Sequence, residues 1–154
     1  MNFIDTAMAE GDNLSEDAFL QAMADIYKEP EVWDILDKYP QYIQDVIYII
    51  DYDTELQMEG LEWVLEDCGH KPEKYEKMHS ALVNAGALVE ARILHEAHVL
   101  YESWLLGSGE KDEYEEQYYE QMEKLQSQTA LYNDYESFWD LVRDYIRKNR
   151  ILSF

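Results

Sequence analysis

Acidic side chains recur at helical spacing in two segments of the sequence. Carboxylates in such rows can act as general acids, as metal ligands or as a negatively charged surface. Side chains at i, i+4, i+7 and i+11 share one face of an α-helix. Like charges at i,i+4 destabilise a helix by about 0.2–0.5 kcal/mol per pair, and segment 55–68 contains no Lys or Arg to relieve them. The acids of the two segments are Asp51, Asp53, Glu55, Glu59, Glu62 and Glu66, and Glu113, Glu116, Glu120 and Glu123.

The spacing of these rows is compatible with imitation of DNA phosphates. At 1.5 Å per residue, one such row places a charge about every 5.5 Å along the helix axis. Packed helices lie about 8–10 Å apart, which is between the widths of the minor (~6 Å) and major (~12 Å) grooves. Two acidic helices side by side could therefore present two phosphate-like rows. The alternative is an acidic helical scaffold whose charge serves only solubility.

Other chemistry is poorly supported by the sequence. Asp51, Asp53, Glu55 and Glu62 fall at positions 1, 3, 5 and 12 of a calcium-loop template, but Leu56 occupies the position that requires glycine. The histidines of 95–98 do not have the i,i+4 spacing of a zinc helix. No phosphate loop or nucleophile motif is present. We therefore expect neither an enzyme nor a metal site or other cofactor.

The net charge of the chain is unusually negative for a folded domain. The chain has 154 residues and a formal net charge of -22, yet 47% of its residues are hydrophobic and 13 are tyrosines. Such a chain can bury a core, unlike a disordered acidic tail. The single cysteine, Cys68, excludes an internal disulfide, and residues 1–12 do not resemble a signal peptide. We expect a cytoplasmic protein without a membrane span.

The basic residues gather at one end of the sequence. Residues 1–142 contain 33 acidic and 8 basic residues, whereas residues 143–154 contain four basic residues and one acidic residue. We expect this cluster to contact an acidic patch, within the chain or on a second copy, and not to bind nucleic acid directly. A homodimer through this end is a hypothesis. Its candidate interface residues are Arg143, Arg147, Arg150 and Phe154.

Hydrophobic periodicity predicts an all-α fold, a single compact domain of about seven or eight helices over residues 1–154. Ser15, Pro30 and Pro72 are suited to helix starts, and Thr54 begins a capping-box pattern. The β-branched run 46–50 could form a strand, but no second strand candidate exists to pair with it. The predicted helices cover residues 15–27, 30–39, 42–50, 54–68, 72–83, 87–105, 110–132 and 137–149, with a loop at 107–109.

Two short motifs resemble a known family. They are Glu59-Gly60-Leu61-Glu62-Trp63-Val64-Leu65 with Cys68-Gly69, and Ala81-Leu82-Val83-Asn84-Ala85-Gly86-Ala87. The chain resembles an all-helical bacterial domain family of unknown function that includes a neisserial DNA mimic. Glu59 departs from this family, in which a second glycine is common at that position. The resemblance implies a dimer that binds a DNA-binding protein, a helix-turn-helix transcription repressor, and keeps it off its operator.

Overall fold

The structure is a computed structural model, and it describes residues 3–11, 15–69, 71–107 and 112–152. The described residues form ten α-helices and one short 3-10 helix, and no strand occurs among them. Eight of these helices have seven or more residues, so the predicted all-α fold is confirmed. Of the predicted loop 107–109, Ser108 and Gly109 lie outside the described residues. None of the described helices is both long enough and apolar enough to cross a membrane.

The N-terminal third consists of short helices: α1 (Phe3–Gly11), α2 (Glu16–Ile26), α3 (Pro30–Ile35) and the 3-10 helix η1 (Leu36–Lys38). The predicted caps are confirmed here. The side chain of Ser15 accepts a hydrogen bond from the Ala18 backbone N–H, and Pro30 is the first residue of α3. Helix α1 was not predicted from the sequence. It is short, and only one narrow face of it is buried.

The central helix differs from the prediction. Residues 42–50 and 54–59 form one continuous helix, α4 (Gln41–Glu59), so the Thr54 capping box is not a helix start. Helix α4 instead ends before Gly60, which has φ 95°. A separate helix, α5 (Leu61–Gly69), follows it. A positive φ is readily adopted by glycine and rarely by other residues. The predicted single helix with four aligned glutamates at 55–66 is therefore wrong.

The C-terminal half contains α6 (Pro72–Asn84), α7 (Leu88–Leu106), α8 (Asp112–Ser127), α9 (Ala130–Asn133) and α10 (Tyr135–Leu152). Helices α6 and α7 agree with the predicted segments. The predicted helix 110–132 is divided, because α8 ends at Ser127 and the buried Thr129 precedes α9. Helix α10 begins two residues before Ser137, the predicted cap.

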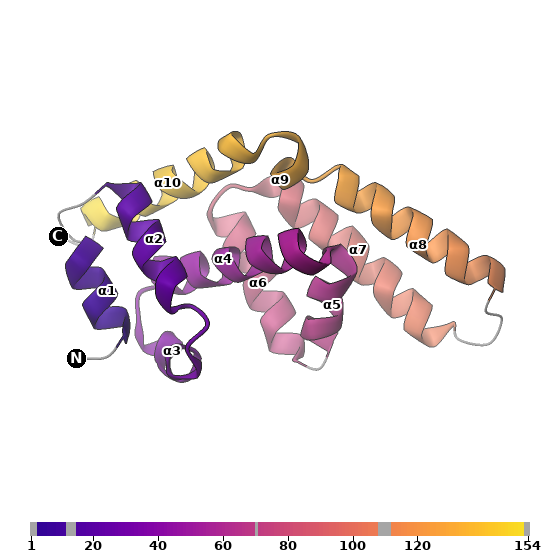
Figure 1. Ribbon diagram of the computed structural model, residues 1–154, viewed down its shortest axis with the longest axis horizontal. Helices are drawn as coiled ribbons and strands as arrows, with labels where there is room; N and C mark the ends of the chain where they lie inside the picture. Colours follow the sequence, from indigo (N-terminus) through magenta and orange to yellow (C-terminus); the bar gives the residue numbers. More distant parts are fainter. Residues whose placement is uncertain (1–2, 12–14, 70, 108–111, 153–154) are drawn as a thin grey trace.

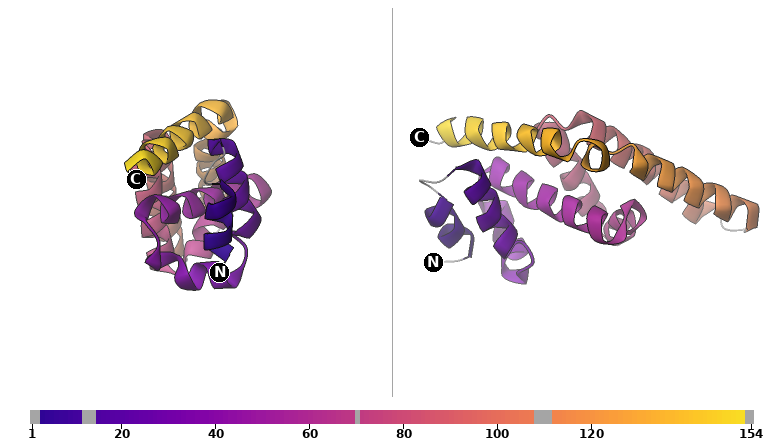
Figure 2. Two further views of the ribbon diagram at one scale, coloured as in Figure 1. Left: turned by 90° about the vertical axis from the view of Figure 1, so that its left-hand side faces the viewer. Right: turned by 45° about the horizontal axis from the view of Figure 1, so that its top comes forward.

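Helix α4 lies at the centre of an elongated molecule and packs against α2, α5, α6 and α10 (Figure 1). Helices α7 and α8 form a hairpin that extends to one end, and both chain ends lie at the other end (Figures 1 and 2). Burial on several sides explains why α4 contains a nearly continuous apolar run. Its fully buried or nearly buried apolar residues are Tyr42, Ile43, Val46, Ile47, Tyr48, Ile49, Ile50, Tyr52 and Leu56.

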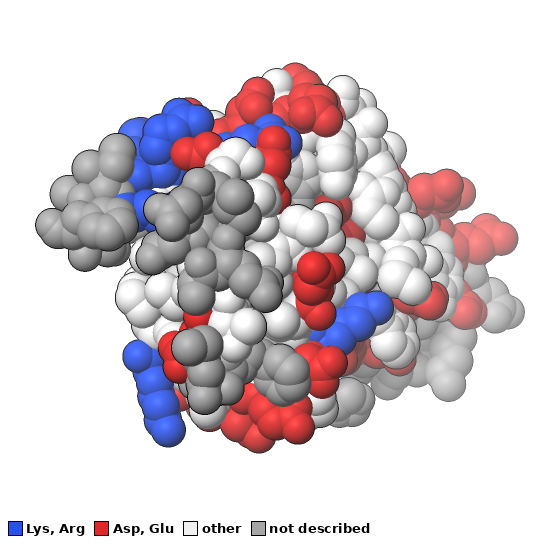
Figure 3. Space-filling model, turned by 60° about the vertical axis from the view of Figure 1, so that its left-hand side comes forward, with Lys and Arg blue, Asp and Glu red and all other residues white. Residues whose placement is uncertain are grey.

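The basic end of α10 contacts α2 of the same chain. Arg143 Nε lies 2.6 Å from Asp17 Oδ1, and Arg147 Nε lies 3.0 Å from Glu16 Oε1. The guanidinium of Arg150 lies 5.4 Å from the centre of the Phe19 ring. Figure 3 shows this end of the molecule, where the basic side chains gather at one edge beside carboxylates. The expected contact with an acidic patch is therefore made within the chain, whereas Phe154 lies outside the described residues.

Candidate functional site

The exposed face of α8 is a continuous acidic surface. The helix buries Tyr118 and Met122 on its inner side, so its outer side faces solvent. Glu116, Glu120 and Glu123 of the predicted row are exposed, and Glu113 lies in α8 but its side chain is outside the described part. These three line a shallow open hollow together with Glu115 and Tyr119.

Two glutamates of α5 belong to the same surface. The carboxylate of Glu62 is the largest cause of a raised pKa at Tyr119, followed by burial and by the carboxylates of Glu115 and Glu66. Burial and then the neighbouring Glu66 raise the pKa of Glu62 itself. The Tyr119 hydroxyl is therefore within electrostatic range of acids on both α5 and α8. We call the following group the α5–α8 acidic surface: Glu62, Glu66, Glu115, Glu116, Glu120 and Glu123.

This surface is not neutralised by the protein's own cations. Within the described part of the chain, no Lys or Arg nitrogen lies within 4.0 Å of its carboxylates. Lys124 in the last turn of α8 makes no ion pair with these acids, so the six carboxylates repel one another, which costs folding free energy. An array of this kind is suited to bind a cationic partner.

Side-chain contacts hold α8 against α5. Gln126 Oε1 accepts a hydrogen bond of 2.9 Å from the backbone N–H of Leu61, the first residue of α5. Gln126 Nε2 donates to the Tyr132 hydroxyl at 2.6 Å. On the hairpin, Tyr118 stacks on Trp104 of α7 with ring centres 4.8 Å apart. The acids of α5 and α8 are thus fixed relative to one another.

Three of the predicted phosphate mimics lie elsewhere and are not free to bind a partner. Asp51 is 7% exposed, and Asp53 and Glu55 are half-buried. Lys74 of α6 lies among the carboxylates of Asp51 (2.9 Å), Glu55 (3.3 Å) and Asp67, which is also in contact. The expected row of Glu55, Glu59, Glu62 and Glu66 on one helix was wrong, because α4 and α5 are separate helices and α4 is central.

The charges of this cluster are strongly coupled. Burial, the hydrogen bond with Asp67 and the charge of Asp51 raise the pKa of Glu55 to about 8. Burial alone would raise the pKa of Asp67, but hydrogen bonds from Glu55 and Lys74 lower it below its usual value. Burial lowers the pKa of Lys74, but its carboxylate partners raise it by more. The pKa is therefore above its usual value, and the amine stays charged.

The same three carboxylates are close enough together to hold a metal ion. The ammonium of Lys74 already lies against all three of them, so the cluster contains its own cation. Residues 51–59 are helical and do not form the loop that a calcium template requires. The arrangement is an internal ion cluster that links α4, α5 and α6.

The described histidines, His79, His95 and His98, lie together with Tyr75 between α6 and α7. The rings of Tyr75 and His98 lie 3.8 Å apart at 12°, and the Tyr75 hydroxyl lies 3.3 Å from Nδ1 of His95. Burial and then the neighbouring His95 lower the pKa of His79, which favours a neutral ring. The histidines therefore contribute to packing between the two helices.

The structure brings together five of the predicted acids: Glu62, Glu66, Glu116, Glu120 and Glu123. Glu59 is exposed at the end of α4. Glu115 and Tyr119 were not predicted as part of the site. The adjacent tyrosines 118 and 119 were a usable signal, because only one of two neighbours on a helix can face the core. Tyr118 is 3% exposed and Tyr119 is 46% exposed.

Comparison with known proteins identifies the family. No curated protein and no solved structure matches the chain. A family model described as DMP19-like protein matches residues 37–149, which is more than two thirds of the chain. The match includes α4 to α9 and nearly all of α10, and hence the whole α5–α8 acidic surface. It agrees with the resemblance carried by the motifs at 59–69 and 81–87, and the chain belongs to the DMP19-like protein family.

Proposed function

We propose that this protein is a DNA mimic whose α5–α8 acidic surface binds the phosphate-contacting Lys and Arg residues of a DNA-binding protein. The partner class that we propose is a helix-turn-helix transcription repressor, which is thereby kept off its operator. The protein would act by occupancy, as an inhibitor and not as an enzyme. The observation that carries the proposal is the unneutralised array of six carboxylates on two adjoining helices, within the part of the chain that the family match covers.

The energetics of DNA binding explain how such a surface could compete. Much of the non-specific affinity of a DNA-binding protein comes from neutralising phosphates and releasing their counterions. Carboxylates on a rigid surface offer the same interaction to the partner's cations without base edges. The complex should therefore weaken steeply as salt increases, and DNA should displace the mimic from its partner.

The test is capture of the partner from a lysate of the source organism at low salt, followed by elution with duplex DNA. A variant with Glu62, Glu66, Glu116 and Glu120 replaced by Gln should lose the partner and keep its helical fold. The matched control carries Glu29→Gln, Glu31→Gln, Asp34→Asn and Glu76→Gln, which removes the same charge from exposed positions elsewhere. This control should bind nearly as well as the native chain.

Two results would contradict the proposal. One is a ternary complex in which the partner holds the protein and its operator DNA together. The other is equal loss of binding in both variants, which would mean that net charge alone matters. If neither variant loses the partner, the protein is the acidic scaffold of the alternative hypothesis, with its docking site outside the α5–α8 acidic surface.

A further inference from the structure

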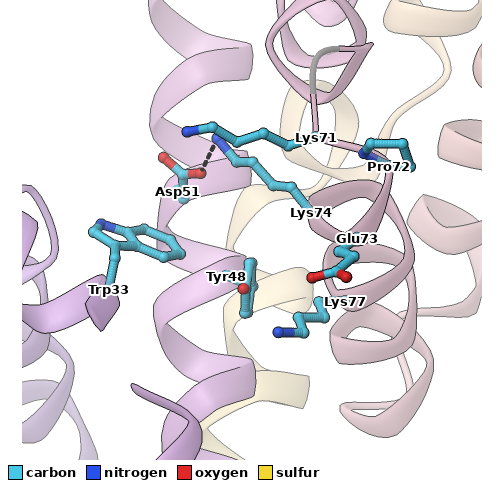
Figure 4. A pocket seen from close by; sticks show the side chains of 8 residues that line it. All are labelled: Trp33, Tyr48, Asp51, Lys71, Pro72, Glu73, Lys74 and Lys77. Atoms are coloured by element: carbon cyan, nitrogen blue, oxygen red, sulfur yellow. Dashed lines mark ion pairs between the residues drawn. The ribbon is translucent and has the colours of Figure 1, made fainter. Parts of the chain in front are cut away.

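A cavity of about 670 Å³ lies between α3, α4 and the beginning of α6. Its volume falls within the range of about 300–1,000 Å³ that is typical of small-molecule sites. Figure 4 shows the lysine side chains of α6 extending towards α4, with Trp33 of α3 facing them. The residues that line the cavity are Trp33, Tyr48, Asp51, Lys71, Pro72, Glu73, Lys74 and Lys77.

The lining of this cavity is locally basic on an acidic protein. The whole chain has 12 Lys and Arg against 34 Asp and Glu, yet three lysines and only two acids line the cavity. Lys71 is the N-cap residue of α6, and Lys74 and Lys77 follow in its first two turns. Cations at a helix N-terminus oppose the helix dipole. Helix stability therefore does not explain why these lysines are placed here.

Two of the three lysines have no carboxylate partner. Lys74 is paired with Asp51, Glu55 and Asp67. Burial raises the pKa of Asp51, and the charges of Lys74 and, last, Lys71 oppose that rise. Among the described residues, however, no carboxylate lies within 4.0 Å of the Nζ atoms of Lys71 and Lys77, and Figure 4 marks an ion pair only between Asp51 and Lys74. Two ammonium groups at the cavity are thus available to an anion.

The aromatic side of the cavity is held in place. Trp33 Nε1 donates a hydrogen bond of 2.6 Å to the backbone oxygen of Tyr27, which fixes the indole. Tyr48 packs edge-on against Trp33, with ring centres 5.2 Å apart at 73°. Trp33 is only partly buried, so part of its indole is exposed, beside the ammonium group of Lys74 that lies 6.0 Å from the ring centre. A flat ring could pack there without rearrangement of either side chain.

We propose that this cavity binds a small aromatic anion, with its ring against Trp33 and Tyr48 and its carboxylate or phosphate on one of the two unpaired lysines, Lys71 or Lys77. A cationic ligand would meet these two ammonium groups, and a neutral apolar ligand would cover them without pairing them. A bare anion would leave the aromatic wall in contact with water. The net charge of the protein does not prevent binding, because charges more than about 8 Å away are largely screened at physiological ionic strength.

The test uses the full chain and needs no protein partner, so it is independent of the proposed DNA mimicry. The probes are 4-hydroxyphenylacetate and AMP, the uncharged analogue adenosine, and inorganic phosphate. Binding is followed by NMR of the tryptophan indole N–H signals, with Trp33 assigned by a Trp33→Phe variant, and by calorimetry. We expect one of the two aromatic anions to bind with a Kd below about 1 mM and to shift the Trp33 signal. Which of them binds more tightly distinguishes a carboxylate ligand from a phosphate ligand.

The variant Lys71→Gln/Lys77→Gln should raise the Kd by about tenfold or more, because it removes the charged donor that holds the anion, whichever of the two lysines supplies it. The control Lys38→Gln/Lys124→Gln removes the same charge outside the cavity and should bind like the native chain. Thermal melting of both variants verifies that they are folded. The proposal is overturned if neither aromatic anion binds, if adenosine or phosphate alone binds as tightly, or if the two variants have the same affinity.

Discussion

Lys74 is the residue on which the local electrostatics of three helices depend. Its side chain is only 14% exposed, and its ammonium group contacts carboxylates from α4 and α5. Removal of one partner from a buried ion group is strongly destabilising, because the remaining charges lose their compensation. The cluster also explains why acids as closely spaced as Asp51 and Glu55 can lie in the central helix. Their charge is balanced inside the protein and does not contribute to its outer surface.

Glu55 should make the protein less stable as the pH rises from about 5 to 8. Its pKa is raised from 4.5 to about 8 in the folded state, so the native protein holds a proton that the unfolded chain has released. The free energy of unfolding then falls with pH between these two values, by at most about 1.4 kcal/mol per pH unit. The variant Glu55→Gln should lose this part of the pH dependence in urea unfolding experiments.

The control for this experiment is Glu66→Gln, which removes one negative charge from an exposed position of α5. General repulsion among the acids also increases with pH, and Glu66→Gln shows how much of the pH dependence the loss of one exposed charge accounts for. Only Glu55→Gln should flatten the curve between pH 5 and 8. Parallel curves for the native chain and Glu55→Gln would show that Glu55 is ionised throughout this range.

At the scale of single elements, the sequence predicted helices best where their ends have local signals. Ser15 and Pro72 begin α2 and α6 as predicted, because a side-chain cap and a proline act within one turn. The boundary between two helices was predicted just before Thr54, whereas it lies at Gly60. The capping-box pattern at Thr54 is also local, but the burial of α4 favours a continuous helix through it. Tertiary packing overrides such signals.

The candidate site was predictable only in part, for the same reason. The α8 row follows directly from helical spacing on an amphipathic helix, so it could be read from the sequence. Whether Asp51 and Glu55 face solvent or form an internal ion cluster depends on Lys74, which lies on another helix. No local pattern in the sequence reveals that contact. The junction of α5 with α8 depends on Gln126, a polar residue without any sequence signal of its role.

Gln126 of α8 should stabilise the beginning of α5 and the contact between the two helices. Its side chain accepts the hydrogen bond of the Leu61 N–H, which the first turn of α5 cannot satisfy internally. Loss of a helix cap costs about 0.5–2 kcal/mol. Gln126→Ala should therefore lower the free energy of unfolding by about 1 kcal/mol, measured by urea denaturation. Gln117→Ala, at an exposed position of α8, should cost much less. Equal stability of the two variants would exclude a capping role.

Across the whole molecule, the arginines of α10 lie far from the α5–α8 acidic surface. The basic end of α10 lies near the chain termini, whereas α8 extends to the opposite end (Figure 1). The arginines of α10 are paired with α2, so they do not neutralise the α5–α8 acidic surface. This separation leaves the acidic surface available to a partner and makes self-repulsion a cost of the native fold.

Salt should therefore stabilise the protein. With a net charge of -22, repulsion among the carboxylates exceeds the attraction of the few ion pairs. The screening length falls from about 30 Å at 0.01 M salt to about 8 Å at 0.15 M. Relief of 1 kcal/mol raises Tm by about 2–4 °C for a domain of this size. We expect Tm, measured by circular dichroism, to rise over this range. The rise should be smaller in the variant with Glu62, Glu66, Glu116 and Glu120 replaced by Gln, because less repulsion remains to be screened. A Tm that falls with salt would mean that the ion pairs of Lys74, Arg143 and Arg147 outweigh the repulsion.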